Sequence, residues 1–263
     1  MSYIAQGEAH KKYASLNYKN WYMFVILQKE LNAFFTSLLA YVIIGFFLLL
    51  LGLWMWVFPE TSLLDSGYAD MQPFFNFSPY VFMFLVPAIT MRSFTEDKKV
   101  GTLEILLTSP LTATQIIVGK YLASLAIIIL MLLLTSIYYF SLYYLSIPLG
   151  NIDTAAVIGS YIGLFMLAAA FASIGLFTSS LTESQVIAFL VGSLLCFLLY
   201  QSFDVWATLL PWKSYAFFIT QLGVAYHYDT LRKGIIDSRD LIYFVSVIFI
   251  MLFSTKIVLA HRR

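Results

Sequence analysis

The sequence predicts an all-α integral membrane protein with six transmembrane helices. Of its 263 residues, 61 % are hydrophobic and only 11 % are charged, and the apolar residues gather in six long runs. A soluble domain has roughly 25 % charged residues. The composition therefore excludes a soluble enzyme, a disordered regulator and a nucleic-acid-binding protein.

The six expected spans are the runs long enough to cross roughly 30 Å of hydrocarbon, which takes about 20 residues of helix. No alternating pattern typical of a transmembrane barrel accompanies them, so helices are the expected spanning structure. The runs are Leu38–Phe58, Phe74–Met91, Tyr121–Leu145, Ala155–Phe177, Val186–Phe203 and Leu241–Leu259.

The positions of Lys and Arg predict the orientation, because cytoplasmic loops carry an excess of them. They occur before the first span, between the second and third spans, and at the end of the last span, whereas residues 59–73 and 146–154 contain none. Both termini are therefore expected in the cytoplasm. Four further basic residues precede the last span in a long segment, and long translocated segments tolerate such charges.

The residues before the first span fall into two parts. Residues 1–20 are polar, and we expect a flexible leader. In residues 21–37 the apolar positions recur at helical spacing, which predicts an amphipathic helix in the plane of the membrane surface. This helix is either a simple anchor or a lever that joins a cytoplasmic partner to the first span. Its apolar face contains Phe24, Leu27, Leu31 and Phe34.

The second-to-third connection predicts one short amphipathic helix. Thr95 is a candidate N-cap, and Glu96 and Asp97 suit the positive end of a helix dipole. Pro110 discourages continuation. Spacing alone leaves two interpretations open, a loop helix packed on its own bundle or a docking surface for a soluble subunit. The apolar stripe contains Val100, Leu103, Leu106 and Leu107.

This connection resembles the cytoplasmic coupling segment of type-2 ABC transporter permeases. The shared features are an acidic start, a Gly-Thr-Leu-Glu core, a proline and a Gly-Lys pair, here Glu96, 101–104, Pro110 and 119–120. Residues 234–241 resemble the segment that leads such permeases into their last span. Within the family, residues 74–94 and 234–240 are most similar to the GldF-like gliding-motility subfamily. The resemblance covers residues 21–263, and it implies that these residues form a single permease domain.

The resemblance implies half of an ATP-driven export pathway in the cell inner membrane. The other half would be a longer, different permease chain or a second copy, and membrane lipids would surround both. A separate cytoplasmic ATPase subunit would drive each half and hold ATP and magnesium. No cofactor or metal is expected in this chain.

The family match also implies roles for individual segments. The helix from Glu96 to Glu104 would seat in a cleft of the ATPase, with Leu103 and Leu106 as apolar anchors and Lys98 among the rim contacts. Residues 21–37 would be the connector helix, and residues 204–240 would contain two re-entrant helices at the outer end. The implied coupling residues are Glu96, Lys98, Gly101, Thr102, Leu103, Glu104, Leu106 and Pro110.

The sequence lacks the residues that several other functions would need. Gly119-Lys120 is followed by Tyr121 and is no phosphate-binding loop, so the chain is not expected to hydrolyse ATP alone. The span centres contain almost no ionisable residues, which disfavours an ion-coupled carrier. The three histidines are far apart and no catalytic motif is present, so no catalytic or metal site is predicted. The substrate stays unknown.

Two function classes therefore remain. The first is a transport permease. The second is a membrane anchor that relays ATPase-driven conformational change to an outer partner without moving cargo. In the fourth span, Gly159 and Gly163 lie four residues apart, a pattern that lets helices approach closely. We expect that they serve packing within this chain.

Overall fold

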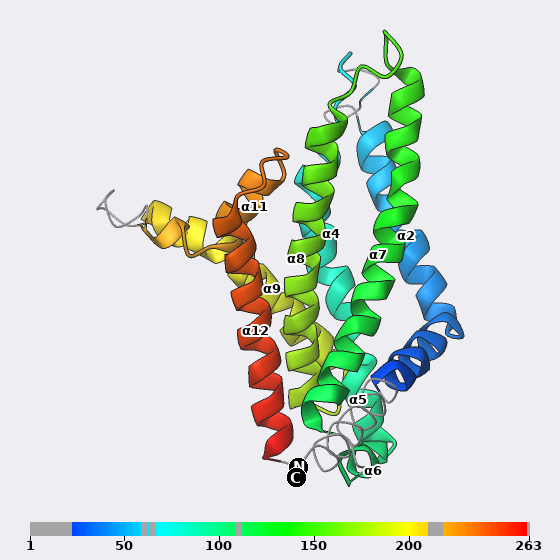
Figure 1. Cartoon of the computed structure of the whole chain (residues 1–263), viewed down its shortest axis with the longest axis vertical. Coiled ribbons are helices and arrows are strands. Elements are labelled where there is room, and N and C mark those ends of the chain that lie inside the picture. The colour runs from blue at the N-terminus through cyan, green and yellow to red at the C-terminus, as the bar shows by residue number, and fades with distance from the viewer. Residues whose placement is uncertain (1–22, 59–62, 64–66, 109–111, 210–217, 262–263) are drawn as a thin grey trace, which may run out of the picture.

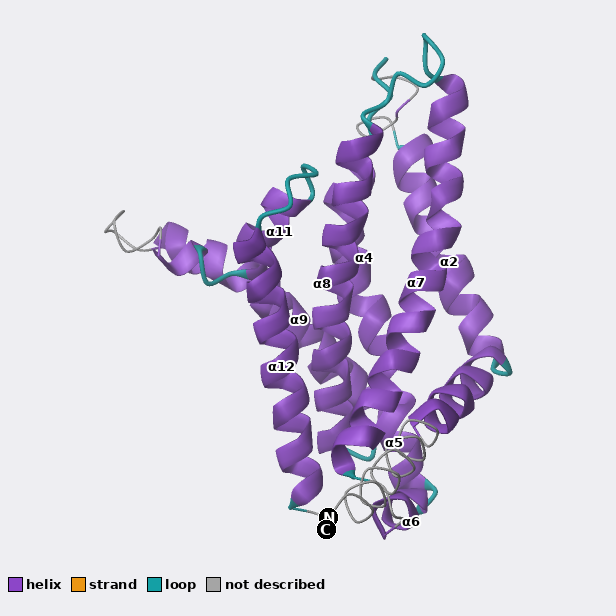
Figure 2. Ribbon diagram, in the orientation of Figure 1, coloured by secondary structure: helices purple, strands orange, loops and turns teal. Residues whose placement is uncertain are grey.

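The structure is a computed structural model of the whole chain, and it describes residues 23–58, 63, 67–108, 112–209 and 218–261 (Figure 1). The secondary structure in these ranges is entirely helical (Figure 2). The predicted leader, residues 1–20, lies outside the described residues. Six described helices are long and apolar enough to cross a membrane, which confirms the predicted fold class.

The six long helices are close to the expected spans. They are α2 (Leu38–Trp56), α4 (Gln72–Thr90), α7 (Ala113–Leu145), α8 (Thr154–Leu181), α9 (Gln185–Leu209) and α12 (Ser238–Ala260). The main differences are an earlier start of α7 and a later end of α9. Three shorter helices accompany them, α5 (Arg92–Lys99), α6 (Thr102–Thr108) and α11 (Val224–Leu231), and residues 23–35 are also helical.

Side-chain caps explain where several helices begin. In α7, Thr112 and Gln115 form a capping box, in which each side chain accepts a hydrogen bond from the other residue's backbone N–H. Asp153 caps α8 and Asp237 caps α12 more simply, each through one carboxylate oxygen that accepts a backbone N–H. The capping box is the reason that α7 begins at Ala113 rather than at the expected Tyr121.

Helix α8 is the centre of the bundle and packs against α4, α5, α7, α9, α11 and α12. Glycines on α8 make this close packing feasible. A Cβ at Gly159 would lie 2.6 Å from the backbone oxygen of Gly234, and one at Gly163 would lie 2.5 Å from Cβ of Leu231. The prediction that these glycines serve packing within the chain is confirmed.

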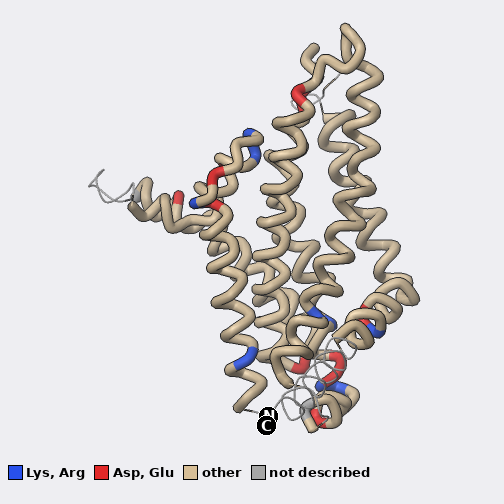
Figure 3. Tube along the Cα trace, in the orientation of Figure 1, with Lys and Arg blue, Asp and Glu red and all other residues tan. Residues whose placement is uncertain are grey.

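The bundle has two distinct ends (Figure 1). Residues 23–35, α5, α6 and the end of α12 lie at one end, which we call the α5 end. Helix α11 lies toward the other end, which we call the α11 end. Charged residues lie mostly toward these two ends, and the middle of the bundle is almost free of them (Figure 3).

Two re-entrant helices were expected between α9 and α12, and in this segment the structure has the short helix α11. Helix α11 contacts α8, α9 and α12. The Tyr228 hydroxyl donates a 2.8 Å hydrogen bond to the Phe75 carbonyl at the start of α4. The other expected helix falls partly on residues 210–217, outside the described part of the chain.

Candidate functional site

The predicted coupling helix is two helices rather than one. Helix α5 ends at Lys99 and α6 begins at Thr102, and between them Gly101 has a φ of +76°. This left-handed conformation favours glycine and ends the first helix. The prediction of one continuous helix from Glu96 to Glu104 is therefore wrong at this glycine.

The expected N-cap is also wrong. Thr95 lies inside α5, and its hydroxyl donates a 2.6 Å hydrogen bond to the Met91 carbonyl. Met91 itself has helical backbone angles, φ −55° and ψ −31°, and its N–H bonds to the Pro87 carbonyl of α4. Helix α5 is therefore almost a direct continuation of α4, and a force on α5 would act on this span.

The break at Gly101 changes which apolar side chains are accessible. Leu103 is only 5 % exposed and belongs to the core of this chain, and Leu106 packs against the same core. Val100 and Ile105 are both 69 % exposed. The expectation that Leu103 anchors a partner therefore needs correction. The apolar stripe was predicted for one continuous helix, and the turn at Gly101 gives the side chains of α6 other directions than that helix would.

The polar residues of the predicted coupling segment also differ in accessibility. Glu96 and Glu104 are exposed, whereas Lys98 is half-buried. The Lys98 ammonium donates to the carbonyls of Ser180 and Thr182, at 2.5 and 3.2 Å. These carbonyls lie at the C-terminal end of α8, where a cation is favourable. Lys98 therefore holds α5 against α8 instead of lying on the outer rim as expected. The side chain of Leu107 and Pro110 lie outside the described residues.

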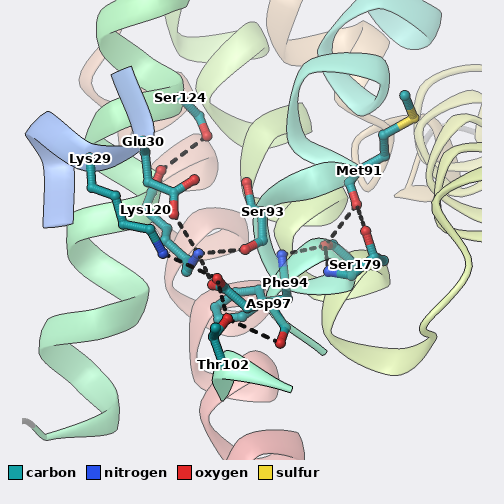
Figure 4. Close-up of polar contacts among 11 residues, drawn as sticks. Lys29, Glu30, Met91, Ser93, Phe94, Asp97, Thr102, Lys120, Ser124 and Ser179 are labelled. Atoms are coloured by element: carbon teal, nitrogen blue, oxygen red, sulfur yellow. Dashed lines mark hydrogen bonds and ion pairs between the residues drawn. The ribbon is translucent and has the colours of Figure 1, made fainter. Parts of the chain in front are cut away.

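At the centre of this region lies a buried lysine, Lys120, whose side chain is 1 % exposed (Figure 4). Its ammonium lies 2.6 Å from Oε1 of Glu30 and 2.5 Å from Oδ2 of Asp97, and donates a 2.5 Å hydrogen bond to the Ser93 carbonyl. Lys29 makes a further 3.2 Å ion pair with Oδ1 of Asp97. We call Lys29, Glu30, Asp97 and Lys120 the Lys120 network.

The Lys120 network balances its own charge, with two ammonium groups and two carboxylates. An ammonium has three donors, and Lys120 has one acceptor for each of them. Without such partners, burial of the charge would be strongly unfavourable. The ammonium also lies 5.2 Å from the centre of the Phe94 ring, which adds a cation–π contact.

The network joins three segments and holds a fourth. Lys29 and Glu30 belong to the helix at residues 23–35, Asp97 belongs to α5, and Lys120 belongs to α7. Helix α6 is tied in through Thr102, whose hydroxyl donates a 3.1 Å hydrogen bond to Oδ1 of Asp97. This bond spans the break at Gly101 and fixes the direction in which α6 leaves α5.

Helix α8 is attached to the same region through Ser179. The Ser179 hydroxyl donates to the Met91 carbonyl at 3.1 Å and accepts from the backbone N–H groups of Phe94 and Thr95, at 2.9 and 3.3 Å (Figure 4). These amides lie in the first turn of α5, where a helix lacks internal acceptors. One serine of α8 therefore caps α5.

The helix at residues 23–35 packs on the bundle with a face slightly different from the expected one. Leu31 and Phe34 pack against the core, as the spacing predicts, and Leu27 is half-buried. Phe24 is 60 % exposed. Ile26 is only 6 % exposed and packs against Gly119 of α7, so the glycine preceding Lys120 provides room for this helix.

Sequence reasoning missed the roles of Lys29, Glu30, Asp97 and Lys120. One feature of the sequence could have identified Lys120 as a buried, paired residue. The Thr112–Gln115 capping box begins α7 early enough to place Lys120 two turns inside a helix, where an unpaired lysine would be costly. The identity of its partners depends on the tertiary fold.

Among the residues that the structure describes, no group of three or more His, Cys, Asp or Glu side chains is arranged to hold a metal ion. His227 pairs with Asp240 at 2.7 Å, and its other ring nitrogen lies 2.9 Å from the Gln221 carbonyl. This histidine connects α11 to the start of α12.

The comparisons with known proteins identify the family. None of the curated proteins compared with the chain matches it. The family model described as ABC-2 family transporter protein matches residues 60–255, which is well over half of the chain and contains α4 to α11 and most of α12. The chain therefore belongs to the ABC-2 family of transporter proteins, as a multi-pass permease subunit of an ABC transporter.

Proposed function

We propose that this chain forms half of the pathway of an ABC exporter and that α5 and α6 couple it to a separate ATPase subunit. The observation that carries the proposal is the Lys120 network, which joins α5 to the helix at residues 23–35 and to α7. ATP and magnesium would bind in the ATPase subunit.

The contacts of α5 support a mechanical role. Helix α5 continues α4, is bonded to α8 through Ser179 and Lys98, and is joined to α7 through Lys120. A displacement of α5 therefore acts on three spans at once. Rigid-body motion of packed helices is a common way to carry a local change across a protein.

The surface offered to the ATPase is the exposed part of α5 and α6. It combines two apolar side chains, Val100 and Ile105, with the carboxylates of Glu96 and Glu104. An apolar centre with a charged rim is the usual anatomy of a protein interface. A complementary cleft on the ATPase would be apolar inside and basic at its edge.

The same proposal places the α5 end in the cytoplasm at the cell inner membrane. Six of the nine Lys and Arg residues in the described part of the chain support it, because they lie in the segments at this end: Lys29, Arg92, Lys98, Lys99, Lys120 and Lys256. The resemblance of residues 74–94 and 234–240 to the gliding-motility subfamily supports a narrower proposal, in which the second permease is a longer chain and the complex serves the cell envelope.

Replacement of Ile105 by Asp tests the coupling role. The chain, with an affinity tag, would be coexpressed with its ABC ATPase and purified in mild detergent. We expect the variant to retain at most a fifth of the ATPase that the wild-type chain retains, because a charge at the centre of the apolar surface would be buried without a partner.

Ile147→Asp is the matched control. Ile147 is 94 % exposed and lies in the connection between α7 and α8, far from α5. This variant should retain the ATPase at the wild-type level and insert equally well into membranes. Equal ATPase recovery with both variants would remove α6 from the docking role.

A further inference from the structure

A cavity of about 80 Å³ lies at the α5 end, where the helix at residues 23–35 meets the bundle. Its lining comes from that helix and from the neighbouring parts of α2, α4, α5 and α7. A water molecule needs about 10–15 Å³ of such space, so the cavity has room for a group of about five heavy atoms, such as one phosphate. The proposed coupling role makes no use of this space.

Arg92, the first residue of α5, lines the cavity with a guanidinium group that lacks partners. Its Nη1 donates a 3.1 Å hydrogen bond to the Ser37 hydroxyl. Its Nε is buried and has no hydrogen-bond acceptor among the residues that the structure describes, and none of their carboxylates forms an ion pair with it. A buried charged donor without an acceptor is unfavourable. An anionic group that enters the cavity would therefore be stabilised.

The other charged residues that line the cavity are Glu30, Lys120 and Glu96. Glu30 and Lys120 pair with each other within the Lys120 network. Glu96 is exposed and forms no ion pair with any described residue. It follows Arg92 by four residues, a spacing at which two helical side chains are neighbours, about 5–6 Å apart at Cβ. The cavity thus offers one unpaired guanidinium and, beside it, one unpaired carboxylate.

Ser37 places the cavity at the level of the membrane surface. It is the N-cap of α2, and its hydroxyl accepts a 3.3 Å hydrogen bond from the Leu39 N–H. Because α2 is the first span, the hydrocarbon begins beside Ser37, and the helix at residues 23–35 bends away from α2 there (Figure 1). The Ser37 hydroxyl only accepts in its described bonds, so its proton is available to an anion at headgroup depth.

An apolar surface continues from this level along α2. Leu38, Val42 and Phe46 follow one another at intervals of four residues and are 80, 60 and 58 % exposed. Residues at this spacing share one face of a helix. The acyl chains of a lipid whose phosphate enters the cavity would lie along this face. A free phosphate ion would gain nothing from it.

We propose that this cavity binds the headgroup of phosphatidylethanolamine. The Arg92 guanidinium and the Ser37 hydroxyl donate to the phosphate oxygens, and the lipid ammonium donates to the Glu96 carboxylate. The two-carbon spacer of ethanolamine separates its charges by about one helical turn, as Arg92 and Glu96 are separated. The bound lipid fills the junction of α2, α5 and the helix at residues 23–35. This site goes beyond the coupling role and needs no ATPase.

Other ligands match the cavity less well. Phosphatidylglycerol brings a phosphate without an ammonium, so Glu96 would face a like charge. Phosphatidylcholine has a positive charge, but its three N-methyl groups replace the N–H donors that Glu96 would accept from. A free cation would meet the Arg92 guanidinium. Inorganic phosphate meets Glu96 as phosphatidylglycerol does and lacks the acyl chains as well.

The test is native mass spectrometry of the purified chain, which resolves each lipid molecule that stays bound. The protein in mild detergent is equilibrated with equal amounts of two lipids that have the same acyl chains. Phosphatidylethanolamine competes with phosphatidylcholine in one sample and with phosphatidylglycerol in the other. We expect the first bound lipid to be phosphatidylethanolamine at least three times as often as either competitor.

Two variants and one control locate the binding. Arg92→Gln should lower phosphatidylethanolamine binding at least threefold, because the phosphate loses its charged donor. Glu96→Gln should remove the preference over phosphatidylglycerol, because the like charge is gone. Lys99→Gln is the matched control, since Lys99 is an exposed cation of the same helix outside the cavity lining. Thermal unfolding shows whether each variant folds, and Glu96→Gln, at an exposed position, keeps the test decisive if Arg92→Gln does not fold.

Differential scanning fluorimetry separates the lipid from a free phosphate ion. A ligand that binds only the folded chain raises its melting temperature. Phosphatidylethanolamine should do so for the wild-type chain and for Lys99→Gln but not for Arg92→Gln, and excess inorganic phosphate should have no effect.

Three results would overturn the proposal. They are equal binding of the competing lipids to the wild-type chain, a preference that Arg92→Gln and Glu96→Gln both leave unchanged, and Arg92-dependent stabilisation by inorganic phosphate without a lipid preference. These measurements use no ATPase, so their failure is separate from failure of the proposed coupling. A chain that captures the ATPase through Ile105 yet shows no lipid preference would contradict only the lipid site.

Discussion

At the scale of single residues, Lys120 is the most deeply buried charged residue in the described chain. It is buried against two carboxylates and a carbonyl that belong to two other segments. From the sequence, the pair Gly119-Lys120 is predicted only as part of a family pattern, directly before the expected third span at Tyr121. The glycine accommodates Ile26, and the lysine bonds the segments that meet there.

Replacement of Lys120 by Met tests this role. The change leaves Glu30 and Asp97 as partly buried carboxylates with fewer partners, and removing one member of a buried ion pair costs about 3–5 kcal/mol. We expect a clear fall of the melting temperature in detergent, measured by differential scanning fluorimetry. Lys256→Met is the matched control, because Lys256 is exposed near the end of α12, and its melting temperature should hardly change. A Lys120→Met variant as stable as the control would show that the network contributes little.

At the scale of elements, α8 determines how closely its neighbours approach. Its glycines face α11 and the residues that follow it, and Gly175 faces Thr90 at the end of α4. Sequence reasoning predicted the small-residue surface and its use within the chain, because Gly-x3-Gly has a direct geometric consequence. It did not predict the break at Gly101, since a glycine inside an amphipathic pattern is compatible with a continuous helix or with a turn.

Replacement of Gly159 by Ala tests the close packing of α8. The new Cβ would meet backbone atoms of Gly234 at 2.6 to 3.0 Å, and backbone cannot move aside as a flexible side chain can. We expect a destabilisation of about 1–3 kcal/mol, seen as a lower midpoint of thermal unfolding. Gly45→Ala, in α2, is the control because nothing lies within 4 Å of its Cβ, and alanine should there be neutral or stabilising by up to about 1 kcal/mol. Equal effects of the two substitutions would contradict the contact.

At the scale of the whole molecule, most of the architecture could be predicted from sequence. Six apolar runs become six long helices, because hydrophobicity and length alone decide whether a segment can span a bilayer. The proposed coupling site could be predicted only in outline. The segment was identified by its resemblance to a family. The burial of Leu103 depends on its contacts with the core, and the role of Lys98 depends on its contacts with α8. Such contacts form only in the tertiary fold, and no local sequence pattern predicts them.

The orientation of the molecule gives the last prediction. The chain has a single cysteine, Cys196, which is fully buried, so cysteines introduced on the surface can be labelled with little background. Glu104→Cys on α6 and Asp153→Cys at the start of α8 place a thiol at opposite ends of the bundle. With the α5 end in the cytoplasm, a membrane-impermeant maleimide added to spheroplasts should label the Asp153→Cys chain and not the Glu104→Cys chain. Lysis of the spheroplasts should then expose Glu104→Cys, which shows that the thiol is reactive. Labelling of Glu104→Cys before lysis would place α5 and α6 outside the cell, where no ATPase with access to cytoplasmic ATP could reach them.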